Sequence, residues 1–293
     1  MMLSIVIRTY NEEKHLASLL ESIRSQRVED NELEVVVVDS GSTDRTISIA
    51  EKHECRLVHI SKDEFTFGRS LNIGCHAAKG DILVFISGHC IPVCEDWLMS
   101  LTSPIIEGKV TYIYGRQVGN HTSKYSECQL LKKYYPEKSN IPQEGFFCNN
   151  ANAALLRSAW EQEKFDETLT GLEDMELGKR LTKKGINLGY VAGAPVYHLH
   201  NEAWHKVRIR YERESFALQH IMPQIHIGKI DMLRYFLSAV LLDCGSAAQE
   251  KMFLNKFVEI VMFRMMQYWG TYRGNHEHRE LSRKMKEEYF YPK

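Results

Sequence analysis

Residues 82–92 read ILVFISGHCIP, and this stretch decides what kind of fold the chain can adopt. Ile82–Ile86 is a continuous apolar run that includes an aromatic side chain, which is typical of a strand buried on both faces of a sheet. The polar segment Ser87–His89 follows directly, and Pro92 cannot donate a ladder hydrogen bond. The stretch therefore predicts a core strand that delivers polar side chains at its carboxyl end.

Three similar apolar runs precede this strand, at Leu3–Ile7, Leu33–Val38 and Arg56–Ile60, and helical patterns separate them. Strands that alternate with helices predict an α/β fold with a mostly parallel sheet flanked by helices. Asn11 is expected to cap the first helix. Further along, we expect helices at Asp96–Ile106 and Asp174–Lys184, a loop or mobile helix at Asn120–Gln143, strands at Val110–Tyr114 and Phe146–Leu156, a strand pair at Ile186–Tyr197, and only helices from Ala203 onward.

Polar side chains follow three of the expected strands at the point where each ends. Thr9–Asn11, Asp39–Gly41 and Ser87–His89 all take this position. Ligands of open parallel sheets bind beyond the carboxyl ends of the strands. The three segments therefore predict one crevice at a single edge of the sheet.

Composition narrows the class of protein. The 37 Lys and Arg residues balance 38 Asp and Glu residues, which argues against a nucleic-acid partner. Seven cysteines without a CxxC pair are typical of reduced thiols in a cytosol. The chain begins with neither a basic segment nor a long apolar one and contains no apolar run of about 18 residues, so we expect no signal peptide and no spanning helix.

Two of the candidate positions allow an ordinary structural role beside a functional one. Asp39 suits an Asx-turn or helix cap, or a carboxylate that accepts a hydrogen bond from a ligand. His89 suits a loop, or a divalent-metal site shared with His198 and His200, since imidazole is a good ligand for Mn²⁺, Zn²⁺ or Fe²⁺. The segment after Asp39 lacks the GxGxxG spacing and therefore does not support a dinucleotide fingerprint.

Two helical segments also have two readings. Acidic residues at Glu173–Glu176 complement a helix dipole, or one of them acts as a general base. Phe253–Met266 is a core or interface helix, or an amphipathic helix that lies on a membrane surface. Basic residues nearby would assist that second reading: Arg273, Arg279, Arg283, Lys284 and Lys286.

Taken in order, three segments within about residues 3–225 resemble the inverting family 2 glycosyltransferases of GT-A fold. Ser4–Glu12 resembles the opening strand of that family, Val38–Asp44 its nucleotide-binding turn, and Glu173–Leu177 with Arg180 its catalytic helix. Three further segments resemble a branch identified as bacterial rhamnosyltransferases of O-antigen and capsule synthesis: Glu64–Gly74, Tyr114–Gln117 and Val196–Asn201.

The resemblance implies a GT-A domain over 1–225, with a nucleotide-binding half at 1–118 and an acceptor or catalytic half at 119–225, followed by a helical extension at 226–293. It implies transfer of a sugar from dTDP-rhamnose or a UDP-sugar to a hydroxyl of a growing surface glycan (capsule, O-antigen or LPS), in the cytoplasm or at the inner face of the plasma membrane. A degenerate member that binds nucleotide-sugar without transfer is the alternative.

The resemblance also implies roles for individual residues. Asp174 would deprotonate the acceptor with support from Glu173, and Arg69 and Asn72 would position the donor. The nucleotide and donor would bind at Thr9, Tyr10, Asn11, Glu12, Asp39, Ser40, Gly41, Ser87, Gly88 and His89.

The chain departs from the family where Asp-x-Asp is usual, because Ser87–His89 stands there. The family's carboxylates bind Mn²⁺ or Mg²⁺ at the donor diphosphate. Here His89 with His198 or His200 would hold a divalent cation, with Mn²⁺ favoured over Mg²⁺. Otherwise the leaving diphosphate would be stabilised by cationic side chains such as Arg69, Arg208 and Arg210.

Overall fold

The computed structural model describes residues 1–200, 202–276 and 283–292. Asn201 of the strand-end motif and Arg279 of the expected basic cluster lie outside these residues, and Arg283 and Lys284 are described by their backbone alone. The chain divides into a sheet unit (1–118, 135–168 and 173–199) and a helical unit (119–134, 169–172 and 200–293). The expected boundaries at residues 118 and 225 stay a prediction.

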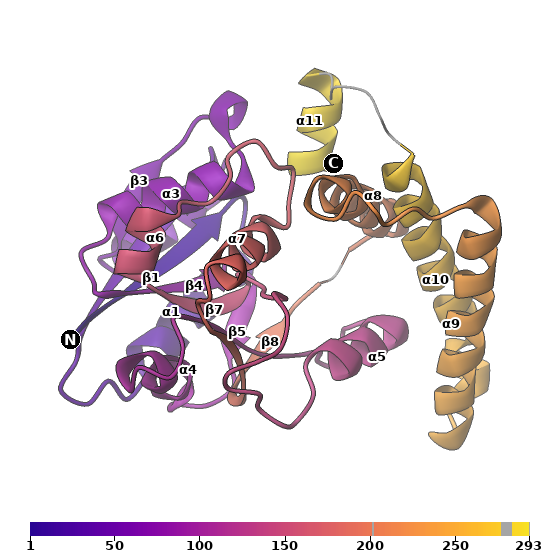
Figure 1. Cartoon of the computed structure of the whole chain (residues 1–293), viewed down its shortest axis with the longest axis horizontal. Helices are drawn as coiled ribbons and strands as arrows, with labels where there is room; N and C mark the ends of the chain where they lie inside the picture. Colours follow the sequence, from indigo (N-terminus) through magenta and orange to yellow (C-terminus); the bar gives the residue numbers. More distant parts are fainter. Residues whose placement is uncertain (201, 277–282, 293) are drawn as a thin grey trace. The chain divides into compact units, whose positions relative to one another are not determined.

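The sheet unit carries one eight-stranded sheet in the order β3-β2-β1-β4-β7-β6-β8-β5 (Figure 1). Its strands are β1 (Met2–Thr9), β2 (Glu32–Asp39), β3 (Arg56–His59), β4 (Ile82–Ser87), β5 (Cys90–Pro92), β6 (Tyr112–Val118), β7 (Asn152–Leu156) and β8 (Leu188–His198). Its helices are α1 (Leu16–Arg24), α2 (Thr46–Lys52), the 3₁₀ turn η1 (Lys62–Glu64), α3 (Phe67–Ala77), α4 (Trp97–Ile106), α6 (Arg157–Gln162) and α7 (Glu173–Lys183).

Parallel pairing dominates the sheet, which confirms the predicted α/β class. β1 pairs in parallel with β2 and β4, β2 with β3, and β6 with β8. β7 runs antiparallel to β4 and β6, and β5 runs antiparallel to β8. The expected strand pair at 186–197 is a single strand, β8, because its two halves continue along the same partner, β6, with a register shift between them.

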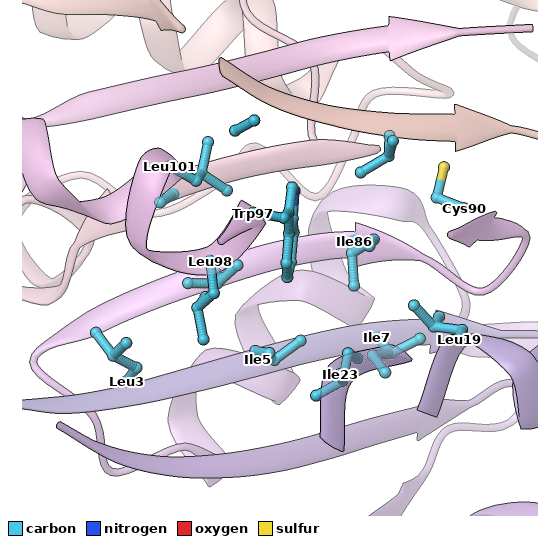
Figure 2. Close-up of a cluster of buried hydrophobic side chains, with 14 of the residues drawn as sticks. Leu3, Ile5, Ile7, Leu19, Ile23, Ile86, Cys90, Trp97, Leu98 and Leu101 are labelled. Atoms are coloured by element: carbon cyan, nitrogen blue, oxygen red, sulfur yellow. The ribbon is translucent and has the colours of Figure 1, made fainter. Parts of the chain in front are cut away.

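Apolar side chains from β1, α1 and α4 fill one side of the sheet (Figure 2). The alternating residues Leu3, Ile5 and Ile7 point to this side, as the period of a strand requires. α1 contributes Leu19 and Ile23 at helical spacing, and burial of such a side chain stabilises the fold by about 1.5–3 kcal/mol. The core therefore fixes β1 and β4, whose carboxyl ends carry the candidate residues.

The opposite side of β1 and β2 is covered by α3, and Gly74 allows the close approach. A Cβ atom at Gly74 would overlap side-chain carbons of Val6 and Val38. The helix therefore lies nearer to the sheet than any larger residue would permit.

The expected cap of the first helix is wrong. α1 begins at Leu16 with His15 at the N-cap position, and Asn11 lies four residues earlier. The backbone of Asn11 has φ +54°, and its side-chain oxygen accepts a hydrogen bond from the backbone N–H of Thr43. The Asn11 side chain thus bonds the loop after β2 instead of capping α1.

The helical unit contains α5 (Tyr125–Tyr134), α8 (Trp204–Ile221), α9 (Lys229–Gln249), α10 (Phe253–Asn275) and α11 (Arg283–Phe290). α5 lies within the stretch expected to be a loop or mobile helix. Within the helical unit, α9 and α10 are joined by a buried ion pair between Asp243 and Arg264. Among the described residues, no helix has the length and apolar character needed to cross a bilayer.

Candidate active site

The loops that follow β1 and β2 are joined by hydrogen bonds. The parallel register places Thr9 beside Asp39. Asn11 N–H donates to Ser42 Oγ (2.8 Å), and Glu12 N–H donates to Thr46 Oγ1 (2.7 Å). The sheet thus brings together the predicted residues Thr9, Tyr10, Asn11, Glu12, Asp39, Ser40 and Gly41.

Asp39 is buried, and its carboxylate accepts hydrogen bonds within these loops. Oδ2 accepts from the backbone N–H groups of Gly41 and Ser42, each at 2.9 Å. Oδ1 accepts from the hydroxyls of Ser42 and Thr9. This is the Asx-turn reading of Asp39, and its role toward a ligand stays a prediction.

Gly88 lets the end of β4 lie against Glu12. A Cβ atom at position 88 would lie 3.0 Å from Glu12 Cγ and 3.2 Å from the Arg8 carbonyl oxygen. With that space open, His89 Nδ1 lies 2.8 Å from Glu12 Oε1. The segment after β4 therefore packs against the loop after β1 and contacts Glu12 through Gly88 and His89.

Strand pairing brings His89 and His198 together. β5 and β8 pair with Cys90 opposite His198, which sets the two imidazoles side by side. Their Nε2 atoms lie 3.2 Å apart, and the rings stack with centroids 5.1 Å apart. His198 Nδ1 lies 2.6 Å from Gln117 Oε1 on β6. The sequence offered one signal for Gln117, its place in the segment Tyr114–Gln117 that resembles the rhamnosyltransferase branch, and no role followed from it.

His200 belongs to the helical unit. There its Nδ1 lies 2.9 Å from Glu127 Oε1, and Arg210 Nη2 donates to the same carboxylate at 2.7 Å. Burial is the largest single effect on the Glu127 carboxyl and raises its pKa, but Arg210 and His200 together outweigh it and lower the pKa to about 2. Arg208 pairs with Glu212 in the same unit. Arg208 and Arg210 therefore each have a carboxylate partner within the helical unit.

Glu173 and Asp174 form the first turn of α7, and both are buried. Glu173 Oε1 accepts from Arg8 Nη1 at 3.0 Å, so the strand β1 supplies its cation. The Arg8 guanidinium also lies over the Phe67 ring, 5.0 Å from its centroid. The Glu173 carboxylate is thus held by an ion pair to the first strand.

Asp174 has no such cation among its hydrogen-bond partners in the part of the chain that the structure describes. Its Oδ2 accepts from the backbone N–H of Asn150 and its Oδ1 from that of Met175, both at 2.8 Å. Burial, assisted by the neighbouring Glu173 charge, raises the pKa of Asp174 from 3.8 to about 7, although the two N–H groups and Arg8 oppose the rise. A carboxyl with this proton affinity is suited to act as a general base near neutral pH.

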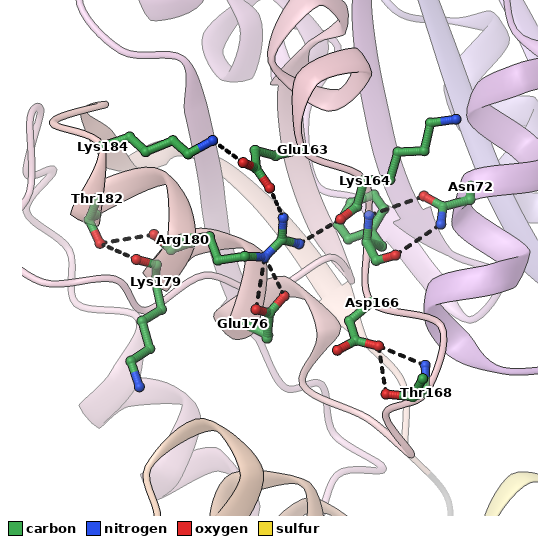
Figure 3. A network of polar contacts seen from close by, with 12 residues as sticks. Asn72, Glu163, Lys164, Asp166, Thr168, Glu176, Lys179, Arg180, Thr182 and Lys184 are labelled. Atoms are coloured by element: carbon green, nitrogen blue, oxygen red, sulfur yellow. Dashed lines mark hydrogen bonds and ion pairs between the residues drawn. The ribbon is translucent and has the colours of Figure 1, made fainter.

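Ion pairs anchor α7 to the segment that precedes it (Figure 3). Arg180 Nε donates to Glu176 at 2.8 Å, and the same guanidinium pairs with Glu163, which also pairs with Lys184. The predicted motif residue Arg180 therefore holds α7 in position.

Asn72 is likewise bonded to the chain that precedes α7. Its Nδ2 donates to the Phe165 carbonyl and to Glu167, and its Oδ1 accepts from Trp160 Nε1 at 3.0 Å. Arg69 is partly exposed and pairs with Glu64 at 3.3 Å. The donor-positioning roles of Asn72 and Arg69 stay predictions.

Residues 4–163 match the family described as Glycosyl transferase family 2. The O-antigen chain rhamnosyltransferase RfbN of Salmonella typhimurium is 25% identical over 217 residues, which cover 69% of this chain and 67% of RfbN. The O-antigen chain rhamnosyltransferase WbaN of Salmonella anatum is 29% identical over 180 residues, which cover 57% of each chain. The matched region is thus less than two thirds of the length of WbaN.

The fold is similar to that of the mannosyltransferase PcManGT from Pyrobaculum calidifontis, solved with GDP-Man and Mn²⁺. The TM-score is 0.62 with 18% identity, and the match covers 93% of this chain and 84% of PcManGT. At that identity the likeness concerns the fold. Because the family match spans more than half of the 293 residues, the chain belongs to glycosyltransferase family 2 and is a transferase of GT-A fold.

Proposed function

We propose that this glycosyltransferase moves a sugar from dTDP-rhamnose or a UDP-sugar to a hydroxyl of a growing bacterial surface glycan. The acceptor would belong to a capsule, an O-antigen or a lipopolysaccharide. The names of RfbN and WbaN support a rhamnosyl donor and an O-antigen acceptor. The resemblance of the motifs to the rhamnosyltransferase branch points the same way.

The observation that carries the proposal is the burial of the Asp174 carboxyl and its raised pKa. Its buried carboxylate takes the proton of the acceptor hydroxyl, and the acceptor oxygen forms a bond to the anomeric carbon. The bond from that carbon to the diphosphate oxygen breaks on the opposite face, which inverts the configuration. The raised pKa of Asp174 matches this proton transfer to neutral pH.

Glu173 supports Asp174 in this role. Its ion pair with Arg8 fixes the first turn of α7 and supplies a compensating charge for one of the two adjacent carboxylates. Asp174 is left with neutral hydrogen-bond donors. The proton from the acceptor would therefore go to Asp174.

The pair His89 and His198 fits a divalent cation. Two nitrogens 3.2 Å apart are within reach of one ion, since metal–nitrogen bonds are about 2.0–2.1 Å for Zn²⁺. Imidazole ligands favour Mn²⁺ over Mg²⁺, which prefers oxygen. We propose Mn²⁺, which would offset the charge that develops on the leaving diphosphate. His200 as a further ligand stays a prediction of the sequence.

A donor screen on the purified chain tests the function. Nucleotide diphosphates and their sugars are added with and without Mn²⁺, and thermal stability is measured beside donor hydrolysis and transfer. A ligand at a hundredfold excess over its Kd stabilises a protein by about 2.7 kcal/mol. We expect a dTDP- or UDP-sugar to stabilise the chain and to be consumed. Stabilisation without hydrolysis or transfer would support the degenerate binder instead.

We propose in addition that the α9–α10 pair contacts the inner face of the cytoplasmic membrane. Exposed apolar side chains occupy both helices, among them Leu241 at 72% and Leu254 at 89% exposure. The charged residues of Phe253–Tyr272 are at least partly buried, so this stretch offers a surface suited to a lipid interface.

Sedimentation with anionic vesicles tests the membrane contact. Leu254→Glu is expected to reduce the bound fraction, and Gln249→Glu, which adds the same charge at an exposed polar position, serves as the matched control. Equal binding of Leu254→Glu and wild type would contradict the contact.

A further inference from the structure

We propose that Gln117 and Asn149 are positioning residues that fix the tautomer of His198, so that its Nε2 presents a lone pair to a cation. This inference rests on the cation proposed at His89 and His198. It assigns a task to two buried or half-buried side chains outside the predicted ligand set. Three hydrogen bonds lead to His198, and each donor is determined by the bond before it.

The chain of hydrogen bonds begins at a backbone group. The N–H of Ala151 can only donate, and it lies 3.0 Å from the Asn149 side chain, which must therefore present Oδ1. That oxygen also lies 3.0 Å from the amide of Gln117, which must therefore present its Nε2–H. The amide of Gln117 is thus fixed in one orientation.

The orientation of Gln117 decides which nitrogen of His198 carries the proton. Gln117 Oε1 faces His198 Nδ1 at 2.6 Å, and an amide oxygen can only accept. Nδ1 of His198 therefore carries the hydrogen, and Nε2 of the neutral ring has the lone pair. Gln117 is 2% exposed, so water has little access to replace this acceptor.

A carboxylate imposes the same tautomer on His89. Glu12 Oε1 lies 2.8 Å from His89 Nδ1, and an ionised carboxylate accepts only. The Nε2 atoms of the two rings face each other at 3.2 Å. In the neutral rings both lone pairs point into this gap, where a shared proton or one metal ion is within reach of both nitrogens. The partners at the two Nδ1 atoms therefore direct both Nε2 lone pairs at a common cation.

Partners of this kind tune metal sites. A ligating histidine that donates its other N–H to a carboxylate or a carbonyl oxygen is oriented and made more basic, and loss of such a partner weakens metal affinity by about 10–100-fold. Glu12 acts on His89, and Gln117 acts on His198. A role limited to packing would leave the tautomer and the metal affinity unchanged.

The test measures both properties in the donor-free chain. Nitrogen-15 correlation spectra of the imidazoles in the metal-free wild type should show His198 protonated at Nδ1. In Gln117→Met, which removes the acceptor but keeps the side-chain length, the Nε2–H form should appear and Mn²⁺ affinity by calorimetry should fall about 10–100-fold. Gln117→Glu keeps an acceptor toward His198 and should restore most of the affinity.

Asn149→Asp is the matched control for the far end of the chain, because an aspartate oxygen still accepts from both Ala151 and Gln117. It should bind Mn²⁺ like the wild type, whereas Asn149→Leu should not. Protonation of His198 at Nε2 in the wild type would overturn the inference without any variant. So would unchanged Mn²⁺ affinity in Gln117→Met, or no Mn²⁺ binding by the folded wild type. None of these results decides sugar transfer, which the donor assay measures separately.

Discussion

Asp174 in the sheet unit and Asp243 in the helical unit are both buried aspartates, with exposures of 7% and 4%. Asp243 receives two hydrogen bonds from Arg264, from Nε at 2.7 Å and from Nη2 at 2.8 Å. Asp174 accepts hydrogen bonds from two backbone N–H groups and has Glu173 as its neighbour. Of these two aspartates, Asp243 alone has a cationic hydrogen-bond partner among the described residues.

The difference distinguishes a carboxylate held in an ion pair from the one that we propose to be reactive. The buried ion pair joins two helices and compensates the charges of both its groups. A buried carboxylate without its own cation holds a proton more tightly and can take one up near neutral pH. The following predictions test whether the two aspartates differ in this way.

The largest expected effect is on catalysis. Asp174→Asn removes the base with little change in size, and kcat should fall by about 10²–10⁴-fold. The measurement is transfer rate at saturating donor and acceptor. Glu161→Gln, which neutralises an exposed carboxylate of the same unit, should retain the wild-type rate. Full activity in Asp174→Asn would refute the assigned base.

The next effect is on stability. Asp243→Ala leaves the Arg264 charge buried without its partner and should lower the free energy of unfolding by about 3–5 kcal/mol. Urea unfolding monitored by circular dichroism gives the value. The double variant Asp243→Leu with Arg264→Met should recover most of the loss, because both charges are then absent. If the single variant lowered the free energy of unfolding by less than about 1 kcal/mol, the ion pair would not hold α9 and α10 together.

Asp174 should also make stability depend on pH in a direction opposite to that of an ion-paired acid. Between pH 3.8 and about 7 the folded chain keeps a proton on Asp174 that the unfolded chain releases. This stabilising contribution is complete below the unfolded pKa and is lost as the pH rises through the folded pKa. Between pH 4 and pH 8 the wild type should therefore lose more stability than Asp174→Asn, as measured by urea midpoints. Parallel pH profiles would contradict the raised pKa.

The smallest effect concerns Arg8, whose charge lowers the pKa of Asp174. Arg8→Met removes that charge, so the acidic limb of the kcat/KM profile should move to higher pH, by about one unit or less. Arg45→Met, which removes an exposed cation paired with Glu13, is the control and should leave the limb in place. A shift toward lower pH would mean that another group governs the limb.

Much of the fold was predictable because local apolar patterns mark buried strands. Ile82–Ile86 indicated β4, and the runs at 3–7 and 33–38 indicated β1 and β2. The direction of β7 was not predictable, since an apolar run has no preferred orientation. The N-cap assigned to Asn11 failed because a tertiary contact with Thr43 determines its conformation.

The candidate site was predictable in part. Glu173 and Asp174 are recognisable by their motif, but the cation that distinguishes them is Arg8, which lies 165 positions earlier in the sequence. Gln117 could not be assigned from the sequence because its role depends on the register between β6 and β8. Residues that act through a partner on another strand carry little local signal.

The ion pair between Arg8 and Glu173 has a consequence for how the protein is made. Its two residues are 165 positions apart, so at about 5–20 residues per second the ribosome needs roughly 8 to 33 s to add the second after the first. During that interval the nascent chain holds the first strand and its arginine without α7, which carries Glu173 and Asp174. A chain released within that interval would lack both acids.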